Sequence, residues 1–319
     1  MCYSARVRQN LSQLSKRYGA KVAWQMYEEI FRRRAAGEDI RVARGLERNF
    51  AHPSTEIEVR TKEYIDQYVA RRKGEWENEI FTQRRRLGAA EESLKVKETK
   101  KSREDVRIAS KKIQTLLERL ADIRRSEPVE DDERIFPLSF APVLVQKNGE
   151  TIIVPMRYAC RLGDKPANYD FRFPGTYNAR RDNLAGFWKN VYGRRHAVMV
   201  ISGFFENVPK HLYEHRDLLP EEKPENLVLQ FDPRPSEDML VACIWDQWKG
   251  PNQPDLLSFA AITDEPPPEI AATGHQRCVI VIEQKNLDRW LSPSKATPAE
   301  LDAILNERAE RIFEHQIAA

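Results

Sequence analysis

Proline is distributed very unevenly along this 319-residue chain. Only Pro53 precedes residue 128, and the other eighteen prolines follow it. Because proline interrupts helices and the interior of sheets, a long proline-free segment favours helix, whereas a proline-rich segment favours short elements joined by turns. The sequence therefore divides near residue 130 into two parts that follow different folding rules.

The proline-free segment 54–127 has the composition of long helices. It contains only two glycines, and its residues 81–125 carry 14 basic and 7 acidic side chains, as solvated helices do. Upstream, apolar residues at mostly three-and-four spacing predict an amphipathic helix over about residues 11–35. Proline and acidic residues in 126–133 end the helical part. The pattern leaves open whether these helices form a hairpin or a coiled-coil dimer.

Beyond residue 134 the apolar residues form short runs rich in β-branched side chains, bounded by turn formers. Residues 141–146 and 151–154 flank Asn148-Gly149, which predicts a β-hairpin. Most spacers between the later runs are too short or too rich in proline for crossover helices. We therefore predict an α+β fold with a mainly antiparallel, barrel-like β core over about 134–295. Further strands are expected at 197–201, 227–231, 239–245, 256–262 and 278–282, and Thr297-Pro298 predicts a C-terminal helix over 297–315.

Charge, hydropathy and cysteine spacing limit the partners, compartment and cofactors that we expect. Lysine plus arginine (52) nearly balance aspartate plus glutamate (49), so the net charge of +3 gives no global argument for a nucleic-acid or membrane partner. The chain has no apolar run of about 18 residues and starts without an apolar leader, which predicts a cytoplasmic protein. The four cysteines lie far apart and the histidines show no ligand spacing, so we expect free thiols, no metal and no cofactor.

Cys2 is the residue with the most distinctive chemistry. Removal of Met1, which is normal before a small residue, would make Cys2 the N-terminus. An N-terminal cysteine carries an amine and a thiol on neighbouring carbons, so the amine can condense with an aldehyde and the thiol can close a thiazolidine ring. With pKa values of about 7.7–8.0 for an α-amino group and about 8.5 for a thiol, both nucleophiles are available near neutrality. The alternative is a frayed terminus with an incidental cysteine.

Asn178 and Arg180 lie two apart on a predicted extended segment, so their side chains point the same way and could converge on one phosphodiester. Basic and aromatic residues alternate over 171–216, which is typical of a groove for single-stranded nucleic acid. A solvated basic surface is the alternative.

Two further segments supply candidate functional residues. Glu206 ends an apolar strand, where partial desolvation of a carboxylate favours proton exchange. His275 and Arg277 precede the predicted strand 278–282, in a loop of the kind that often carries function. The alternatives are an exposed strand-end glutamate and a structural histidine.

Taken in order, these segments resemble the SOS-response-associated peptidase family, the abasic-site-processing proteins. The resemblance extends from Met1 to about Leu291, apart from the helical stretch of about residues 10–130, which resembles an insertion into a single domain spanning 1–319. The segments that carry it are Cys2, Pro155-Met-Arg157, Asn178-Ala-Arg180, Ser202-Gly-Phe-Phe-Glu206 and Gly274-His-Gln-Arg277.

The resemblance implies a DNA-damage-response enzyme that binds single-stranded DNA at abasic sites and crosslinks to it through a thiazolidine on Cys2, after self-removal of Met1. It also implies a lyase-like strand incision and association with the nucleoid when DNA is bound. Asn178 would orient the amine or the sugar, Glu206 would shuttle protons, and His275 would assist sugar ring opening and crosslink reversal. The implied DNA contacts are Arg180, Arg277, Arg157 and Arg181.

Two other functions remain open from the sequence. Cys2 could be the nucleophile of an N-terminal-nucleophile amidohydrolase, with its own amine as the base. Alternatively, the basic helical part could bind partners or duplex DNA while the β-rich part has no catalytic role.

Overall fold

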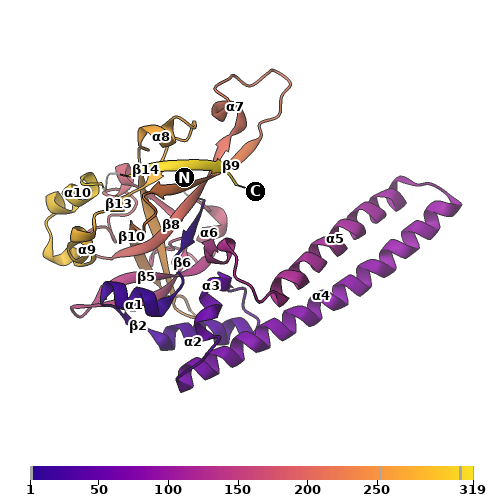
Figure 1. Ribbon diagram of the computed structural model, residues 1–319, viewed down its shortest axis with the longest axis horizontal. Helices are drawn as coiled ribbons and strands as arrows, with labels where there is room; N and C mark the ends of the chain where they lie inside the picture. Colours follow the sequence, from indigo (N-terminus) through magenta and orange to yellow (C-terminus); the bar gives the residue numbers. More distant parts are fainter. Residues whose placement is uncertain (1–2, 252, 309–310, 319) are drawn as a thin grey trace. The chain divides into compact units, whose positions relative to one another are not determined.

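The computed structural model describes residues 3–251, 253–308 and 311–318. The chain forms two compact units (Figure 1). The barrel unit holds the residues up to Tyr27, Ile40–His52 and those from Glu130 onward. The hairpin unit holds Glu28–Asp39 and Pro53–Val129.

Five strands of the barrel unit close into a barrel, in the order β5, β6, β11, β10, β8 and back to β5. Four of the five pairings are antiparallel, and β6 with β11 is parallel. The predicted α+β fold with a mainly antiparallel, barrel-like core is therefore confirmed. The bounds are β5 Ser139–Lys147, β6 Glu150–Tyr158, β8 His196–Pro209, β10 Met239–Trp248 and β11 Leu256–Asp264.

The predicted hairpin joins β5 to β6. Asn148 and Gly149 both have positive φ, 53° and 83°, as the tightest hairpin turns require. Alternate residues of the barrel strands are apolar and buried, and they fill the interior with side chains such as Val143, Met199 and Phe259. The other predicted strands are also present, although 278–282 is divided into β12 (Cys278–Val279) and β13 (Val281–Ile282).

Further strands extend the sheet around the barrel. Strand β1 pairs with β8 and β4, β9 pairs with β8 and β14, and β7 runs parallel to β11. Two strands inside the segment predicted to be helical, β2 and β3, run parallel to β6 and β5. The bounds are β1 Ser4–Val7, β2 Lys21–Val22, β3 Arg41–Val42, β4 Arg134–Ile135, β7 Asn178–Arg180, β9 Asn226–Arg234 and β14 Ile312–Ile317.

The helix predicted over 11–35 is wrong as a single element, because α1 (Leu11–Tyr18) and α2 (Trp24–Ala35) are separate helices with β2 between them. Gly19 ends α1 in the left-handed conformation, with φ 59°. The helix predicted over 297–315 is also too long. It is α10 (Pro298–Asn306), and β14 follows it. Beyond residue 306 the helical interpretation depended on Ile312 alone, and that side chain is exposed.

The hairpin unit consists mainly of α4 (Glu56–Val96) and α5 (Lys100–Arg124), an antiparallel pair within one chain (Figure 1). Thr55 and Glu58 form a capping box at the start of α4, and Thr99 caps α5. Ile80, Leu116 and Leu120 form a small core between the helices.

The remaining helices are short. No helix within the described residues is long and apolar enough to cross a membrane. The bounds of these short helices are α3 Arg44–Glu47, α6 Tyr169–Arg172, α7 Lys210–Tyr213, α8 Pro268–Ala271 and α9 Leu287–Leu291.

Candidate functional site

The pairing of β1 with β8 brings the start of the chain to Glu206. Ser4 lies opposite Phe205 in the register, and the backbone N–H of Tyr3 donates to the carbonyl oxygen of Phe205 at 3.3 Å. Cys2, the predicted nucleophile, lies outside the described residues. Tyr3 is the residue that follows Cys2 in the sequence, and Phe205 is the residue that precedes Glu206.

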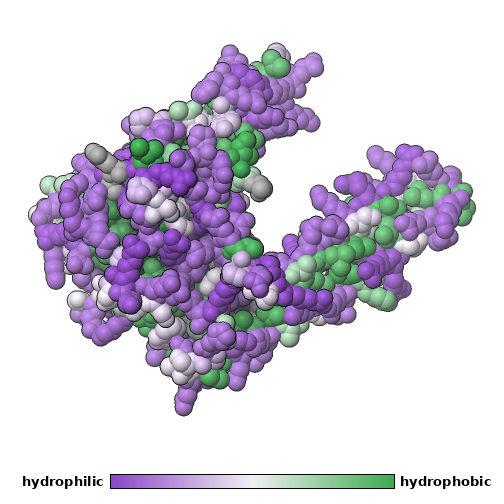
Figure 2. Space-filling view, in the orientation of Figure 1, coloured by the Kyte–Doolittle hydropathy of each residue, from purple (hydrophilic) through white to green (hydrophobic). Residues whose placement is uncertain are grey.

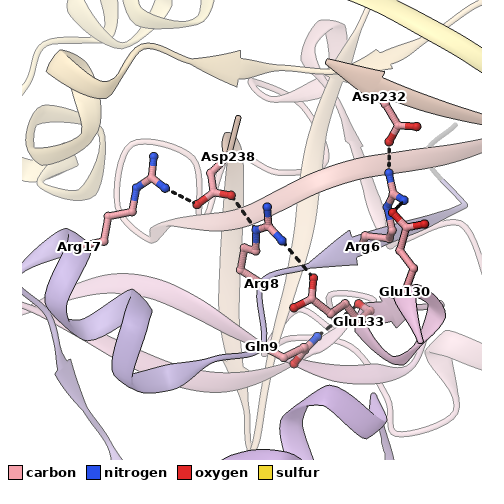
Figure 3. A network of polar contacts seen from close by, with 8 residues as sticks. All are labelled: Arg6, Arg8, Gln9, Arg17, Glu130, Glu133, Asp232 and Asp238. Carbon is pink, nitrogen blue, oxygen red and sulfur yellow. Dashed lines mark hydrogen bonds and ion pairs between the residues drawn. The ribbon is translucent and has the colours of Figure 1, made fainter. Parts of the chain in front are cut away.

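Ion pairs hold the segment that leads away from this start of the chain (Figure 3). The buried Arg6 guanidinium contacts both Glu130 and Asp232, and Asp232 belongs to β9. Arg8 Nε lies 2.6 Å from an oxygen of Asp238, whose other oxygen lies 2.7 Å from Arg17 Nη1. Because the contacts come from separate segments of the barrel unit, they fix β1 in its register beside β8.

Glu206 and His275 form the central pair of the site. Glu206 is fully buried on β8, and His275 Nε2 lies 3.2 Å from Glu206 Oε2. The His275 side chain is 10% exposed, so the pair has one buried group and one group that reaches the surface. A carboxylate and an imidazole at this distance can exchange a proton.

The turn before His275 requires glycine. Gly274 has φ +87°, and a Cβ on it would lie 2.7 Å from Leu212 Cβ. Both the backbone conformation and the close approach exclude a side chain there. This turn follows α8 and places His275 opposite the end of β8.

A pocket of about 350 Å³ opens next to this pair, and Arg180, His275 and Arg277 all line it. Asp182 joins the two arginines: Arg180 Nη2 lies 2.5 Å and Arg277 Nη2 lies 3.4 Å from the same Asp182 oxygen. The hydrogen bond from Arg180, with further attraction from Arg277, lowers the pKa of Asp182 below its usual value. The three groups together carry a net positive charge. The remaining lining residues are Pro209, Leu212, Gly274 and Gln276.

Asn178 begins β7, two residues before Arg180, and lies opposite Ala261 of β11. The residue is 6% exposed. Within the described part of the chain, neither its amide nitrogen nor its carbonyl oxygen has a hydrogen-bond partner. An unpartnered buried polar group is unfavourable by about 1–3 kcal/mol, so such a group in a native fold requires an explanation.

Arg157 and Arg181 are engaged elsewhere. Arg157 Nη2 donates to Asp170 Oδ2 at 2.6 Å, and burial lowers the pKa of this guanidinium. Arg181 donates to Asp264 Oδ2 at 3.1 Å and to Asn306 Oδ1 at 2.6 Å. Neither arginine is among the described residues that line the pocket.

The sequence interpretation missed two residues of the site. Asp182 was not singled out, although its spacing of two from Arg180 on an extended segment was a usable signal. Arg134 was also missed: its guanidinium lies 3.6 Å from the centroid of the Phe205 ring and donates to Ser4 Oγ at 3.1 Å. No pattern in the sequence connects Arg134 with β1, because the contact depends on the pairing of β1 with β4 and β8.

The described cysteines are poor candidates for a nucleophile. Cys160, Cys243 and Cys278 are free and buried, as predicted for their thiols. Burial raises the pKa of Cys160 to about 12 and raises the pKa values of Cys243 and Cys278 as well. The thiol form therefore dominates near neutrality in all three, and it is a poor nucleophile.

The family model described as SOS response associated peptidase (SRAP) matches residues 102–318, more than half of the chain. No curated protein matches the chain. Solved structures that resemble it include a protein from Bacteroides thetaiotaomicron, with a TM-score of 0.47 and 14% identity over 58% of this chain and 77% of that chain. A protein from Bordetella bronchiseptica has a TM-score of 0.46 and 14% identity over 61% and 90%. A phage-related protein of the same organism has a TM-score of 0.44 and 13% identity over 58% and 80%.

Proposed function

This chain belongs to the SOS response associated peptidase family, as its motifs predict, and from that membership and the geometry of the site we propose that it captures abasic sites in single-stranded DNA. The capture is covalent, through Cys2, after the protein has removed its own Met1. The observation that carries the proposal is the contact of buried Glu206 with His275, beside the strand β1 that follows Cys2 in the sequence. We place the activity in the cytoplasm, at the nucleoid.

The reaction joins an aldehyde to an aminothiol with loss of one water molecule. The amine of Cys2 attacks C1′ of the open-chain deoxyribose, and the carbinolamine expels water to give an imine. The Cys2 thiolate then adds to the imine carbon and closes the thiazolidine, while the imine nitrogen takes up a proton. The same imine permits strand incision by elimination, which we propose as a side activity.

Each proton transfer needs a group that can both take and give a proton. Glu206 accepts the proton that the attacking amine loses and returns one to the departing hydroxyl. His275 lies 3.2 Å from Glu206 and at the pocket wall. It exchanges protons between Glu206 and solvent and assists ring opening of the sugar. General acid–base catalysis of this kind contributes about 10²–10⁴-fold in rate.

The remaining polar groups hold the DNA. The unpartnered amide of Asn178 is suited to orienting the sugar or the amine, because bound substrate would satisfy both of its polar atoms. Arg180 and Arg277 line the pocket and bind flanking phosphates in place of Asp182. We assign Arg157 and Arg181 the supporting role of fixing the strands around the site, because Asp170, Asp264 and Asn306 already bind their guanidinium groups.

The test is crosslinking to a labelled single-stranded oligonucleotide that contains one abasic site, read on a denaturing gel. We expect a covalent complex with the wild-type protein and none with Cys2→Ala. An oligonucleotide whose aldehyde has been capped with methoxyamine should give no complex. Crosslinking by Cys2→Ala at the wild-type level would contradict the proposal, and turnover of small amides without DNA would favour the amidohydrolase instead.

A further inference from the structure

The part of the hairpin unit on both sides of the turn between α4 and α5, residues 81–112, carries a local excess of positive charge. This segment, called the hairpin tip below, has eleven basic and five acidic side chains and therefore a net charge of +6. The whole chain has a net charge of only +3, so the remainder of the protein is net negative. A basic segment on an otherwise acidic protein indicates an anionic partner.

Some of these cations form ion pairs within the hairpin. Arg86 pairs with Asp105, Arg103 with Glu98 and Arg107 with Glu104. Lys95 and Lys112 also have carboxylate partners. Within the described part of the chain, no carboxylate lies at ion-pair distance from the others. These exposed cations are Arg84, Arg85, Lys97, Lys100, Lys101 and Lys111.

An aromatic side chain lies among these cations. Phe81 is 64% exposed on α4, and residues three and four positions later on the same helix face are Arg84 and Arg85. The Arg85 guanidinium lies 6.0 Å from the centroid of the Phe81 ring. The surface of the hairpin is mainly hydrophilic, with hydrophobic patches along it (Figure 2).

An exposed ring flanked by guanidinium groups fits an unpaired base on a phosphodiester backbone. The ring stacks on the face of the base, and the cations neutralise neighbouring phosphates. In a duplex the base faces are covered by their neighbours, so the aromatic contact selects single strands.

We propose that the hairpin tip is a second binding surface for single-stranded DNA, separate from the pocket of the barrel unit. The choice of DNA over RNA rests on the proposed function; the charge and the exposed ring do not depend on it. Residues 54–101 precede the region matched by the family model, so all of α4, the turn and the first two residues of α5 lie outside that match. Phe81, Arg84, Arg85 and the lysines of the turn therefore lie outside the matched region, whereas the cations of residues 102–112 lie inside it.

The test uses the full-length protein and an undamaged labelled oligothymidine, which offers no aldehyde and so cannot crosslink. Binding is followed by fluorescence anisotropy over about 50–300 mM NaCl. For Lys97→Gln/Lys100→Gln/Lys101→Gln, we expect affinity near 0.1 M salt to fall about tenfold or more. The slope of log affinity against log salt should decrease by about 2, at about 0.7 per lost phosphate contact.

The matched control is Lys147→Gln/Lys223→Gln/Lys295→Gln, which removes the same charge from exposed positions of the barrel unit. This variant should keep the wild-type slope. An equal loss in both triple variants would show a general charge effect and overturn the proposal, as would full affinity in the hairpin variant. Because no abasic site is present, failure here leaves the crosslinking reaction of the barrel unit untouched.

Phe81→Ala tests the aromatic contact separately. It should weaken binding about fivefold or more at every salt concentration and leave the salt slope unchanged. Wild-type helix content in circular dichroism will show that the variant is folded. If Phe81→Ala instead leaves DNA affinity unchanged and converts a wild-type dimer to a monomer in light scattering, the ring contacts a second copy of the chain and the proposal is wrong.

Discussion

Burial decides what Glu206 can do. The Glu206 carboxylate is fully buried, and His275 Nε2, 3.2 Å from its Oε2, gives it a polar partner that can take or give a proton. The sequence predicted both residues as candidate site residues, but it could not predict their contact. The two lie far apart in the chain, and the contact depends on the end of β8 and on the turn at Gly274.

Replacement of Glu206 should affect the chemistry more than DNA binding. We expect Glu206→Gln to slow covalent capture of an abasic-site oligonucleotide by about 10²-fold or more, because the amide cannot relay a proton. Affinity for undamaged single strands should change little. The control is Glu150→Gln, an exposed glutamate of β6 that pairs with Lys21. A wild-type capture rate in Glu206→Gln would show that this carboxylate takes no part in the reaction.

Asp182 forms ion pairs with Arg180 and Arg277, the two arginines that we assign to phosphate binding. In Asp182→Asn, Arg180 and Arg277 lose the anion that they share, so the pocket becomes more positive. We expect undamaged single-stranded DNA to bind a few times more tightly and with a steeper salt dependence, whereas Arg180→Gln should weaken it. Weaker binding by Asp182→Asn would mean that the aspartate positions the arginines instead of competing with DNA.

His196 makes stability depend on pH. Burial lowers its pKa to about 3, and the neutral ring is held at both nitrogens. Nδ1 lies 3.0 Å from the carbonyl oxygen of Trp290, and Nε2 accepts the backbone N–H of Gly193 at 2.9 Å. A protonated ring could not accept this second hydrogen bond.

The folded-state pKa of His196 lies below the unfolded value of about 6.5, so the unfolded chain binds the extra proton between these values. Stability from this residue is therefore complete above pH about 6.5 and falls as the pH decreases towards about 3, by at most about 1.4 kcal/mol per pH unit. Urea unfolding at several pH values will measure the slope. His196→Gln should flatten it, whereas exposed His52→Gln should not; equal slopes in all three proteins would contradict the assignment.

At the scale of elements, replacing glycine by alanine should have opposite effects on stability at Gly19 and at Gly88. Gly19 ends α1 with φ +59°, so Gly19→Ala should lower the free energy of unfolding by about 1 kcal/mol. Gly88 lies in the interior of α4 with open space around it, so Gly88→Ala should stabilise the hairpin by about 1 kcal/mol. Thermal and urea unfolding followed by circular dichroism will compare them. A more stable Gly19→Ala would show that α1 continues past this residue.

The elements that the sequence predicted well are those whose own residues determine them. The barrel strands are runs of β-branched residues between turn formers, and the turn at Asn148-Gly149 is set by two adjacent residues. The elements that were missed depend on partners distant in sequence. Lys21–Val22 forms a strand because β6 offers an edge, and β14 exists because β9 pairs with it.

At the scale of the whole molecule, composition separated a helical part from a β-rich part, and the two compact units divide the helical part further. Residues 10–27 and 40–52, inside the expected insertion, belong to the barrel unit, and Glu28–Asp39 belong to the hairpin unit. The second half of α2 is held there by the Arg34 guanidinium, 3.7 Å from the centroid of the Tyr68 ring, and by Arg71, which donates to the carbonyl oxygen of Ala35. No periodicity in the sequence encodes these contacts.

The site shows the same division between local and long-range information. Asn178, Arg180, Glu206, His275 and Arg277 were all predicted, because motifs are local. Their grouping by β7, β8 and the turn after α8 required the fold. The resemblance also implied Arg157 and Arg181 as DNA contacts, and the side chains that bind their guanidinium groups come from other segments.

Covalent capture through Cys2 is tested most directly by intact-mass spectrometry. The purified protein is measured alone and after incubation with a single-stranded oligonucleotide that contains one abasic site, with Cys2→Ala in parallel. We predict loss of the Met1 mass from the wild-type protein and an adduct equal to protein plus DNA minus one water, which Cys2→Ala does not form. A retained Met1, or no adduct under conditions in which free cysteine reacts with the same oligonucleotide, would contradict the proposed function.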